Sequence, residues 1–427
     1  MEKRTFSGAG TRARRTSLVA SLLLACWSTW ADAARARPLT LDDALSRALA
    51  ADFVVPAARA RIQGAEAGIR QADRRLNPLF GVEVENFGGS GAYRGIKSPE
   101  TTVFLQQPIE LGGKRAARTG VARSELDATR ARGAVRVLDL FRDVELAWIE
   151  VVTTAAQIRV AEDRLAIAQQ LQGEIARRAQ AGRDPLFTQS RAEAQVALEQ
   201  ITVDQAHAAA RIARANLASY WRGGPNFDVD LNIFESAIST IDGKVFNVDV
   251  AVLEAERELA ASRVGLERAR AVPDPAVRVG VRHFNDTRDA ALIAGLSIPL
   301  PIFDNNSGNI EKAEAERRAA ELDIESGRKT LRREISRLQA RLMASASEAR
   351  RIQSEVVPQA ERAVRLIREG LERGAFSYIE FNDAQRTLND ARLRRIEALK
   401  SFHLDNATLG RLTGRHARLT VRSGSRP

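Results

Sequence analysis

The chain has 427 residues, of which 28% are charged and 5% aromatic, and it carries a formal net charge of +11. Its length allows two or three domains, but a composition rich in Ala, Arg, Glu and Leu is unlike that of a typical multidomain enzyme and favours long helices. Because the arginines are spread among glutamates rather than gathered in one patch, no nucleic-acid partner is expected.

Residues 1–33 have the layout of a secretory signal peptide. An arginine-rich stretch precedes the apolar run SLVASLLLACW, and the small residues ADA follow it. The run is too short to anchor stably in a bilayer, so cleavage after Ala33 is expected. Cys26, the only cysteine, leaves lipoprotein cleavage and lipidation open as an alternative. After cleavage at Ala33 the chain would hold no disulfide, so packing or oligomerisation must stabilise it.

The rest of the chain consists of two copies of one unit. The stretch AGRDPLFTQSRAEAQVAL aligns with RGAFSYIEFNDAQRTLND, which places Gly182 opposite Gly374. Pro108 in the first unit likewise corresponds to Pro301 in the second. The units are predicted at 39–222 and 246–414, with a linker at 223–245 and a flexible tail at 415–427.

Each unit begins with a helix, at 42–74 and 246–271, that stops at a proline-marked break. Thr40 is the expected N-cap of the first helix, with Asp43 as its capping-box partner. Two alternating segments follow each break; in FGVEVENF the valines lie on one face and the glutamates on the other. The strands are predicted at about 79–88, 101–109, 276–284 and 290–300.

A very long helix then follows each strand pair, predicted at 114–181 and 308–373. Apolar residues in both helices recur in the alternating three-and-four spacing of a coiled-coil seam. Each helix would be about 100 Å long, and Pro358 is expected to kink the second one. Helices of about half that length, at 185–221 and 377–413, close two hairpins. In each unit the opening and closing helices can stack end to end along the long one.

The predicted strands have the length that crosses an outer membrane, which is about ten residues. Four strands cannot close into a barrel, and open edges are not tolerated in lipid, whereas three chains would supply twelve strands. The predicted fold class is therefore mainly α with a small β part. Three chains would share a 12-stranded β-barrel that continues as a coiled-coil tube into the periplasm.

The duplicated order of helix, two strands, long helix and shorter helix resembles the TolC family of outer membrane efflux proteins, from Leu39 to Gly414. Within that family, QPIELGGKRAAR at 107–118 and LSIPLPIFDNNSGNI at 296–310 resemble the CzcC-type branch, which serves heavy-metal pumps. The second motif departs from the branch at Asn305, where a basic residue is usual.

The resemblance implies an outer membrane channel of a tripartite resistance-nodulation-division (RND) efflux system in a Gram-negative bacterium, with a large periplasmic part. The implied partners are two further copies in a homotrimer, a periplasmic adaptor (membrane fusion protein), an inner-membrane RND pump and outer membrane lipid. Divalent cobalt, zinc, cadmium or nickel is the implied cargo, with copper or silver, drugs, or type I secretion as alternatives. A periplasmic adaptor is a remote alternative, because adaptors carry one helical hairpin rather than two.

Catalytic and metal-binding sites are not expected. The four histidines are scattered, the chain has two methionines, and no spacing typical of zinc or copper ligands occurs. The sequence therefore predicts no cofactor, no metal site and no enzymatic activity. The GGKR stretch lacks the phosphate-loop frame, so it is interpreted as a turn between a strand and a helix.

The resemblance also implies two functional places at the hairpin ends. Glu380 and Asp383 share a helix face, and in a trimer they would form an acidic ring of six carboxylates that attracts cations; an ordinary solvated face explains them equally well. The residues expected to contact the adaptor are Gly182, Arg183, Asp184, Leu186, Gly374 and Ser377. The residues expected to form the strand-to-helix joints are Pro108, Gly112, Gly113, Pro299, Pro301, Asn305 and Gly308.

Overall fold

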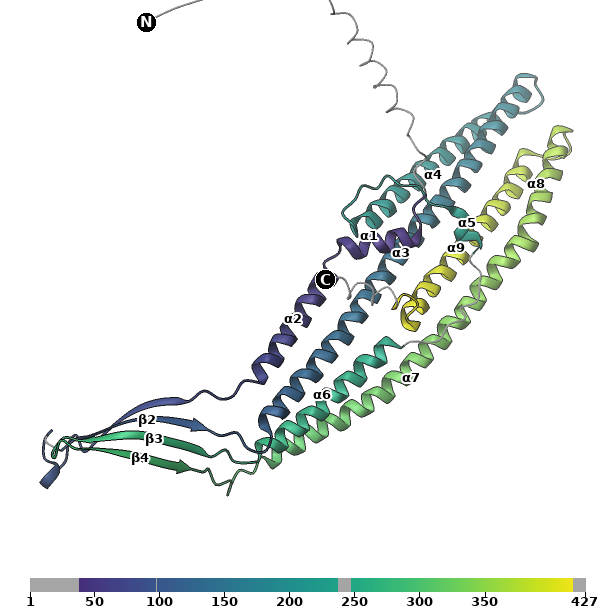
Figure 1. Ribbon diagram of the computed structural model, residues 1–427. Helices are drawn as coiled ribbons and strands as arrows, with labels where there is room; N and C mark the ends of the chain where they lie inside the picture. Colours follow the sequence, from purple (N-terminus) through teal and green to yellow (C-terminus); the bar gives the residue numbers. More distant parts are fainter. Residues whose placement is uncertain (1–37, 97, 237–246, 418–427) are drawn as a thin grey trace, which may run out of the picture.

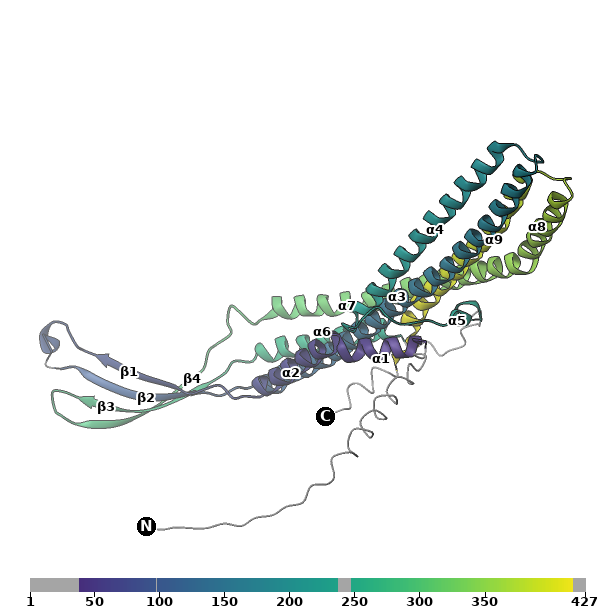
Figure 2. The same cartoon turned by 90° about the horizontal axis from the view of Figure 1, so that it is seen from above.

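The computed structural model describes residues 38–96, 98–236 and 247–417. The predicted signal peptide and the Cys26 alternative lie outside these residues. The molecule is elongated, with a small sheet at one end and the tips of two helical hairpins at the other (Figure 1, Figure 2). Within the described ranges, no helix combines the length and the hydropathy that a bilayer span requires.

The two repeats have matching elements. The first consists of α1 (Leu41–Ala51), α2 (Val54–Ala72), β1 (Leu79–Glu85), the 3-10 turn η1 (Gly91–Tyr93), β2 (Glu100–Pro108), α3 (Lys114–Gln180) and α4 (Leu186–Ser219). The short helix α5 (Leu231–Ser236) lies in the linker. The second consists of α6 (Val248–Arg270), β3 (Ala276–Phe284), β4 (Ala290–Ser297), α7 (Ser307–Arg351), the π-helical segment η2 (Ile352–Val356), α8 (Val357–Glu372) and α9 (Tyr378–Thr413).

The helices form one curved wall. Next to the sheet, α2, α3, α6 and α7 lie side by side in this order, and toward the tips α4, α3, α9 and α8 do the same. Thus α2 and α4 both pack along α3, and α6 and α9 both pack along α7. This is the predicted arrangement of two short helices beside one long one.

The strands form one antiparallel sheet in the order β1-β2-β3-β4. The pairing of β2 with β3 places Val103 opposite Val281 and joins the two repeats. The prediction for β3 is confirmed at both ends, whereas two other predicted strands are too long. β1 stops before Asn86, which has a left-handed φ of 56°. β4 stops at Ser297, two residues before Pro299, which has no N–H to donate to a ladder.

The opening helix of the first repeat is two helices rather than the single predicted one. Thr40 and Asp43 form the expected capping box at the start of α1. The chain becomes extended at Asp52, and the Asp52 carboxylate accepts a hydrogen bond from the Val54 N–H at 2.7 Å. Asp52 therefore ends one helix and supports the first turn of the next, which is also where Pro56 is tolerated.

The two long helices differ in continuity. α3 runs unbroken for 67 residues, which is about 100 Å. The second long helix is interrupted by the five-residue π-helical segment η2, and α8 follows it with Pro358 in its first turn. Because proline lacks an N–H and its ring crowds the preceding turn, the interruption expected at Pro358 is confirmed.

The largest apolar core lies halfway along α3, where Phe141, Val144 and Trp148 are buried under α1, α4, α5 and α9. His403 of α9 is also buried there; its ring stacks on Phe234 of α5, and Nε2 lies 2.9 Å from the Phe234 carbonyl oxygen. Burial lowers the pKa of His403 below its ordinary value.

The predicted tail begins later than expected. Arg415 and His416, which the sequence places in a flexible tail, contact the buried carboxylate of Glu145 at 3.3 and 3.7 Å. The described end of the chain is therefore packed against the middle of α3.

Candidate functional sites at the joints and the hairpin tips

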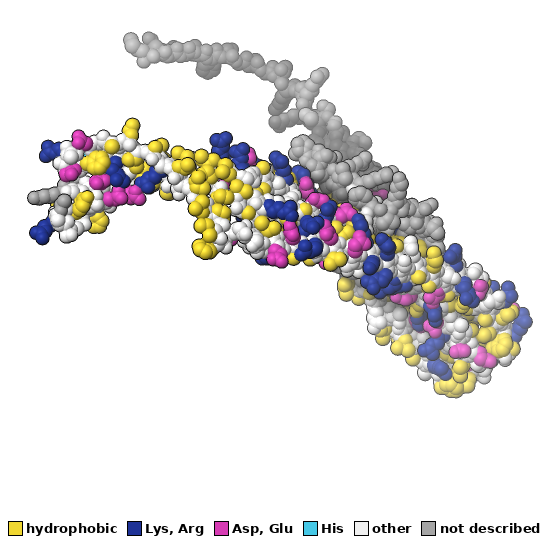
Figure 3. All heavy atoms as spheres, turned by 90° about the horizontal axis from the view of Figure 1, so that it is seen from below, with side chains coloured by type: hydrophobic (Ala, Val, Ile, Leu, Met, Phe, Trp, Pro, Cys, Tyr) yellow, Lys and Arg dark blue, Asp and Glu magenta, His cyan; other side chains and the backbone are white. Residues whose placement is uncertain are grey.

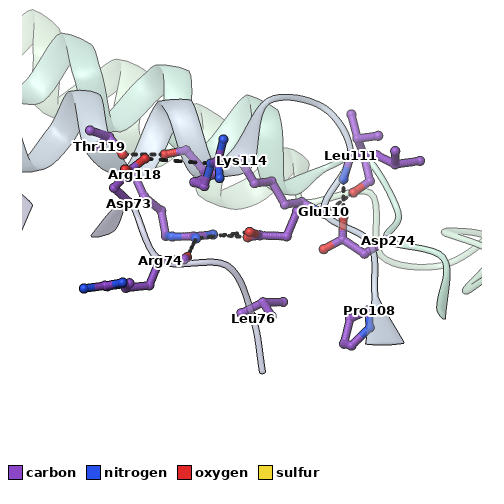
Figure 4. Close-up of polar contacts among 12 residues, drawn as sticks. Asp73, Arg74, Leu76, Pro108, Glu110, Leu111, Lys114, Arg118, Thr119 and Asp274 are labelled. Atoms are coloured by element: carbon purple, nitrogen blue, oxygen red, sulfur yellow. Dashed lines mark hydrogen bonds and ion pairs between the residues drawn. The ribbon is translucent and has the colours of Figure 1, made fainter. Parts of the chain in front are cut away.

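The first strand-to-helix joint, between β2 and α3, is bound to the connector between α6 and β3 (Figure 4). The Leu111 N–H donates to Asp274 Oδ1 at 2.9 Å, and the Lys114 ammonium lies 2.7 Å from the same oxygen. Arg118 binds Glu110 inside the joint, and this hydrogen bond raises the pKa of Arg118 above its ordinary value. The joint is a packed corner in which backbone and charged groups are paired.

Gly112 and Gly113 turn the chain in this joint, with left-handed φ values of 64° and 72°. A Cβ on Gly112 would lie 2.7 Å from the Val272 side chain, whereas nothing lies within 4 Å of one on Gly113. Glycine is therefore favoured at 112 both by the left-handed backbone and by the lack of room for a Cβ. At 113 only the left-handed backbone favours glycine. Pro108 is the last residue of β2 and pairs with Ala276.

In the second joint, between β4 and α7, an asparagine rather than a glycine has the left-handed backbone. Asn306 has a left-handed φ of 61°, and its side-chain amide donates to the Glu267 carbonyl oxygen at 2.7 Å. Asn305 accepts a hydrogen bond from the Ser307 N–H at 3.1 Å. α7 begins at Ser307, one residue before the predicted start at 308, so Gly308 stands in the first turn of the helix.

Apolar side chains of the second joint are exposed in the single chain. In the loop that contains Pro299 and Pro301, Leu300 and Ile302 are each 73% exposed and Phe303 is 101% exposed. In the first joint, by contrast, the apolar side chains are about half as exposed, at 42% for Ile109 and 44% for Leu111. The second joint therefore has an apolar surface that its own chain leaves open.

The two hairpin tips reverse the chain at equivalent glycines, Gly182 and Gly374, with left-handed φ values of 70° and 78°. Beyond the second turn, Ser377 and Glu380 form a capping box at the start of α9. The Glu380 carboxylate accepts from the Ser377 N–H at 2.7 Å, which lowers the pKa of Glu380. The helix start expected at Ser377 is thus fixed by a local hydrogen-bond pair.

Arg178 connects the two tips. Its guanidinium donates to both carboxylate oxygens of Asp184, at 2.7 and 3.2 Å, and to the Leu371 carbonyl oxygen of α8 at 2.6 Å. Buried apolar residues from both hairpins pack beside it: Leu171, Ile175, Ala192, Leu371, Tyr378 and Phe381. Asp184, expected to contact an adaptor, also binds Arg178 within the tip, and the two hairpins are held together there.

Apolar side chains project from both tips. Leu186 is 76% exposed and Phe187 is 69% exposed on the first, and Phe376 and Ile379 are 42% and 56% exposed on the second. A surface hollow of about 380 Å³ lies between α3 and α8 at the tips, with Arg177 among its lining residues. Sequence reasoning singled out Leu186 and missed the three others, although their position beside the turn glycines is visible in the sequence.

The acidic pair lies where the sequence placed it. Glu380 and Asp383 are both exposed in the first two turns of α9. The Glu380 carboxylate is occupied by the capping box, whereas Asp383 contributes its carbonyl oxygen to Thr387 and leaves its carboxylate at the surface. Among the described residues, no group of three His, Cys, Asp or Glu side chains could hold a metal ion.

A short sheet extended by two long, paired helical hairpins is the architecture of outer membrane efflux channels. Its superposition on the solved structure of CusC gives a TM-score of 0.73 at 17% identity, covering 88% of this chain and 92% of that chain. This chain belongs to the outer membrane efflux protein family, which it matches over residues 44–223 and 245–415. The predicted fold class and family are confirmed.

Two relatives support the predicted resemblance to the heavy-metal branch of the family. The chain is 30% identical over 387 residues to the cobalt-zinc-cadmium resistance protein CzcC of Cupriavidus metallidurans, covering 89% of this chain and 91% of that protein. It is 27% identical over 314 residues to the nickel-cobalt-cadmium resistance protein NccC of Alcaligenes xylosoxydans xylosoxydans, covering 73% and 71%. The similarity to CzcC-type proteins predicted from the two joint motifs is confirmed.

Proposed function

We propose that three copies of this chain form an outer membrane channel that exports divalent heavy-metal cations such as cobalt, zinc, cadmium or nickel. The full-length similarity to the cobalt-zinc-cadmium resistance protein CzcC carries this proposal. The channel is a passive conduit, and an inner-membrane RND pump supplies the energy. It therefore needs no metal site of its own, because selectivity can reside in the pump.

The open sheet supports the trimer. β1 and β4 are the outer strands of the four-stranded sheet, and each pairs on one side only within the described residues. Strand edges left unpaired in lipid would leave backbone groups without partners, which costs several kcal/mol each. Three copies would close twelve strands into a barrel in the outer membrane, with the helices extending into the periplasm.

The exposed tips support docking of a periplasmic adaptor. Leu186 and Phe187 project from a turn that Gly182 makes possible, and Arg183 lies at its end. On the second tip, the turn at Gly374 and Ser377 presents Phe376 and Ile379. Aromatic and aliphatic side chains surrounded by a polar rim are typical of protein–protein interfaces.

Glu380 and Asp383 would line the periplasmic entrance of the trimer. Six carboxylates around a narrow opening raise the local concentration of cations and slow the passage of anions. The adaptor would open the entrance by separating the tips, which requires the Arg178 contact between α3 and α8 to break. Metal cations could pass such an entrance without being bound by a set of ligand residues in the channel.

Deletion of the gene and measurement of cellular cobalt, zinc, cadmium, nickel, copper and drug content would test the cargo. We expect divalent metals to accumulate and wild-type protein to restore export. Plasmid-borne Gly182→Val, which strains the tip turn, should restore it poorly despite normal outer membrane levels. Unchanged content of every metal would refute the proposed cargo, and accumulation of copper alone would reassign it.

A further inference from the structure

The four strands have two chemically different faces. Residues that pair across neighbouring strands lie on the same face, so the register assigns each side chain to one of them. One face is apolar in its middle, where Val82, Val103 and Val281 form a row. The other face, here called the charged face, carries every Glu and Arg of the strands: Glu83, Glu85, Glu100, Arg278 and Arg282. In a closed barrel the valine face contacts lipid, so the charged face lines the lumen.

The charged face is the more covered of the two even in a single chain. The side chain of Thr102 on this face is 0% exposed, whereas Val103 and Val281 on the other face are 41% and 46% exposed. An antiparallel sheet of a soluble protein usually buries its apolar face instead. Basic and acidic side chains lie side by side on the sheet (Figure 3). The charged side chains therefore contact one another rather than extend freely into water.

Two carboxylates stand directly opposite each other near the loop end of the sheet, far from the helices. Glu85 of β1 and Glu100 of β2 are cross-strand partners, an arrangement that like charges disfavour. The guanidinium of Arg282 on β3 lies 2.6 Å from Glu85 Oε2 and 2.9 Å from Glu100 Oε2. One cationic group therefore neutralises two carboxylates that come from two other strands.

Further hydrogen bonds hold this arginine and its carboxylates in place. Arg282 Nε donates to the hydroxyl of the buried Thr102 at 3.0 Å. The side-chain amide of Asn86, whose left-handed φ of 56° ends β1, donates to Glu100 Oε1 at 3.0 Å. A planar guanidinium that is bound on several sides has one defined orientation. The site is thus built by all of the first three strands.

The second arginine of the charged face is also held against the sheet. Arg278 binds Glu83, and its guanidinium carbon lies 3.5 Å from the centroid of the Phe104 ring. Gly81 and Gly280 are the cross-strand partners of Phe104 on either side. A Cβ on Gly81 would overlap the Phe104 ring, and one on Gly280 would lie 2.8 Å from Phe104 Cβ. The two glycines therefore make room for the ring that supports Arg278.

The place that Arg282 occupies is one that a divalent cation could otherwise take. Carboxylate oxygens are ligands for hard divalent cations, and two facing carboxylates supply them from two sides. A conduit must bind its cargo weakly enough to release it. Unpaired glutamates at the outer mouth would hold back the same cations that carboxylates at the periplasmic entrance concentrate.

We propose that Arg282 is an internal counter-ion that fills a divalent-cation site between Glu85 and Glu100, and thereby keeps the outer mouth of the channel from retaining the exported cation. Arg278 does the same for Glu83. The inference rests on the proposed channel and deepens it. It makes the two ends of the conduit different, because Asp383 leaves its carboxylate at the surface near the entrance.

Conductance of purified full-length trimers in planar lipid bilayers tests this role. Cobalt(II) chloride is added on the side that the strand loops face, and the concentration that halves the conductance is measured. We expect Arg282→Gln to be blocked at about tenfold lower Co²⁺ than the wild type, because its freed carboxylates can bind the ion. Adding Glu85→Gln should restore the wild-type value. The charge-matched control Arg288→Gln, in the loop between β3 and β4, should leave it unchanged.

The outcomes separate the counter-ion from the channel. The entrance carboxylates are the same in every variant, so a difference between variants reports the outer mouth. An unchanged half-blocking concentration in Arg282→Gln, or an equal decrease in Arg288→Gln, would overturn the counter-ion and leave the channel intact. Lower thermal stability without a change in block would show that Arg282 only joins the strands. Wild-type protein that forms no conducting trimers would overturn the channel itself.

A second variant covers the case in which Arg282→Gln does not assemble. Arg282→Lys keeps the positive charge, but a single ammonium lacks the planar fork that binds both carboxylates. Co²⁺ should therefore compete more easily and block this variant at a lower concentration than the wild type. An unchanged block in assembled Arg282→Lys would overturn the counter-ion as well.

Discussion

The two strand-to-helix joints perform the same turn with different support. In the first, Gly112 and Gly113 provide the conformation, and Asp274 binds Leu111 and Lys114. In the second, Asn306 provides the conformation and binds Glu267, while the adjacent apolar loop is uncovered. The first joint is thus held by contacts within the chain, whereas the second leaves apolar side chains exposed, so the pair should respond differently to substitution.

The largest effect is expected at Gly112. Gly112→Val places a branched side chain at a left-handed φ and against Val272, which should lower the free energy of unfolding by about 2–4 kcal/mol. Denaturant titration in detergent, followed by circular dichroism, measures this loss. The control is Gly308→Ala, which has open space and a helical backbone and should stabilise by about 0.5–1 kcal/mol. Equal losses at both positions would contradict the assignment of Gly112.

A smaller effect is expected at Asn306. Asn306→Ala removes the hydrogen bond to Glu267 and leaves a non-glycine residue with a positive φ, which should cost about 1–3 kcal/mol. The same titration applies. Gly113→Asn copies the second joint into the first and should change stability by less than about 1 kcal/mol, because asparagine tolerates the left-handed region. A large loss from Gly113→Asn would show that the two turns are not interchangeable.

The two tips also differ, because α9 has a side-chain cap at Ser377, whereas Pro185 precedes α4 and provides none. Ser377→Ala should destabilise the start of α9 by about 1 kcal/mol. Hydrogen exchange of the amides at 378–381 should become faster, while exchange at the first tip stays unchanged. Ser377→Thr keeps the hydroxyl and should behave like the wild type; faster exchange in that variant would point to packing rather than capping.

The smallest effect is expected at His403, which is buried beside the middle of α3 rather than at the exposed tips. The pKa of His403 is lowered by burial, so the unfolded chain binds its proton more readily than the folded one. Above its ordinary pKa of 6.5, His403 is neutral in both states and does not change the free energy of unfolding with pH. As the pH decreases below 6.5 toward the lowered pKa, the unfolded chain takes up the proton first and the free energy of unfolding falls. His403→Gln should flatten the thermal stability profile in this window. An unchanged profile would assign the acid sensitivity to another group.

The sequence predicted the architecture well because it depends on repeated, local patterns. Hydrophobic periodicity and the aligned turn glycines predicted the two units, and β3 was predicted with its observed ends. The break at Asp52 was missed, since a single carboxylate that accepts from the Val54 N–H decides it. Asn306, whose left-handed backbone turns the second joint, was not among the residues singled out there.

Contacts at the candidate sites were harder to predict than the elements that carry them. The Arg178 contact reaches a backbone carbonyl of Leu371 in the other repeat, and no side-chain pattern indicates such a partner. The acidic pair was placed on the correct helix, but the role of Glu380 in the cap depends on its hydrogen bond to the Ser377 N–H. A sequence indicates which residues are near a turn more readily than which groups they bind.

The π-helical segment at Ile352–Val356 changes the direction in which side chains point around the helix axis of the second hairpin. The first hairpin has no such change in α3. An ordinary α-helix advances by about 100° for each residue, so a single wider turn rotates every later side chain relative to the earlier ones. α7 therefore directs one stripe toward α6 and α9, while α8 directs another toward α9 and, at the tip, toward α3. The two halves of this long helix follow separate registers, and their packing surfaces can change length or sequence independently.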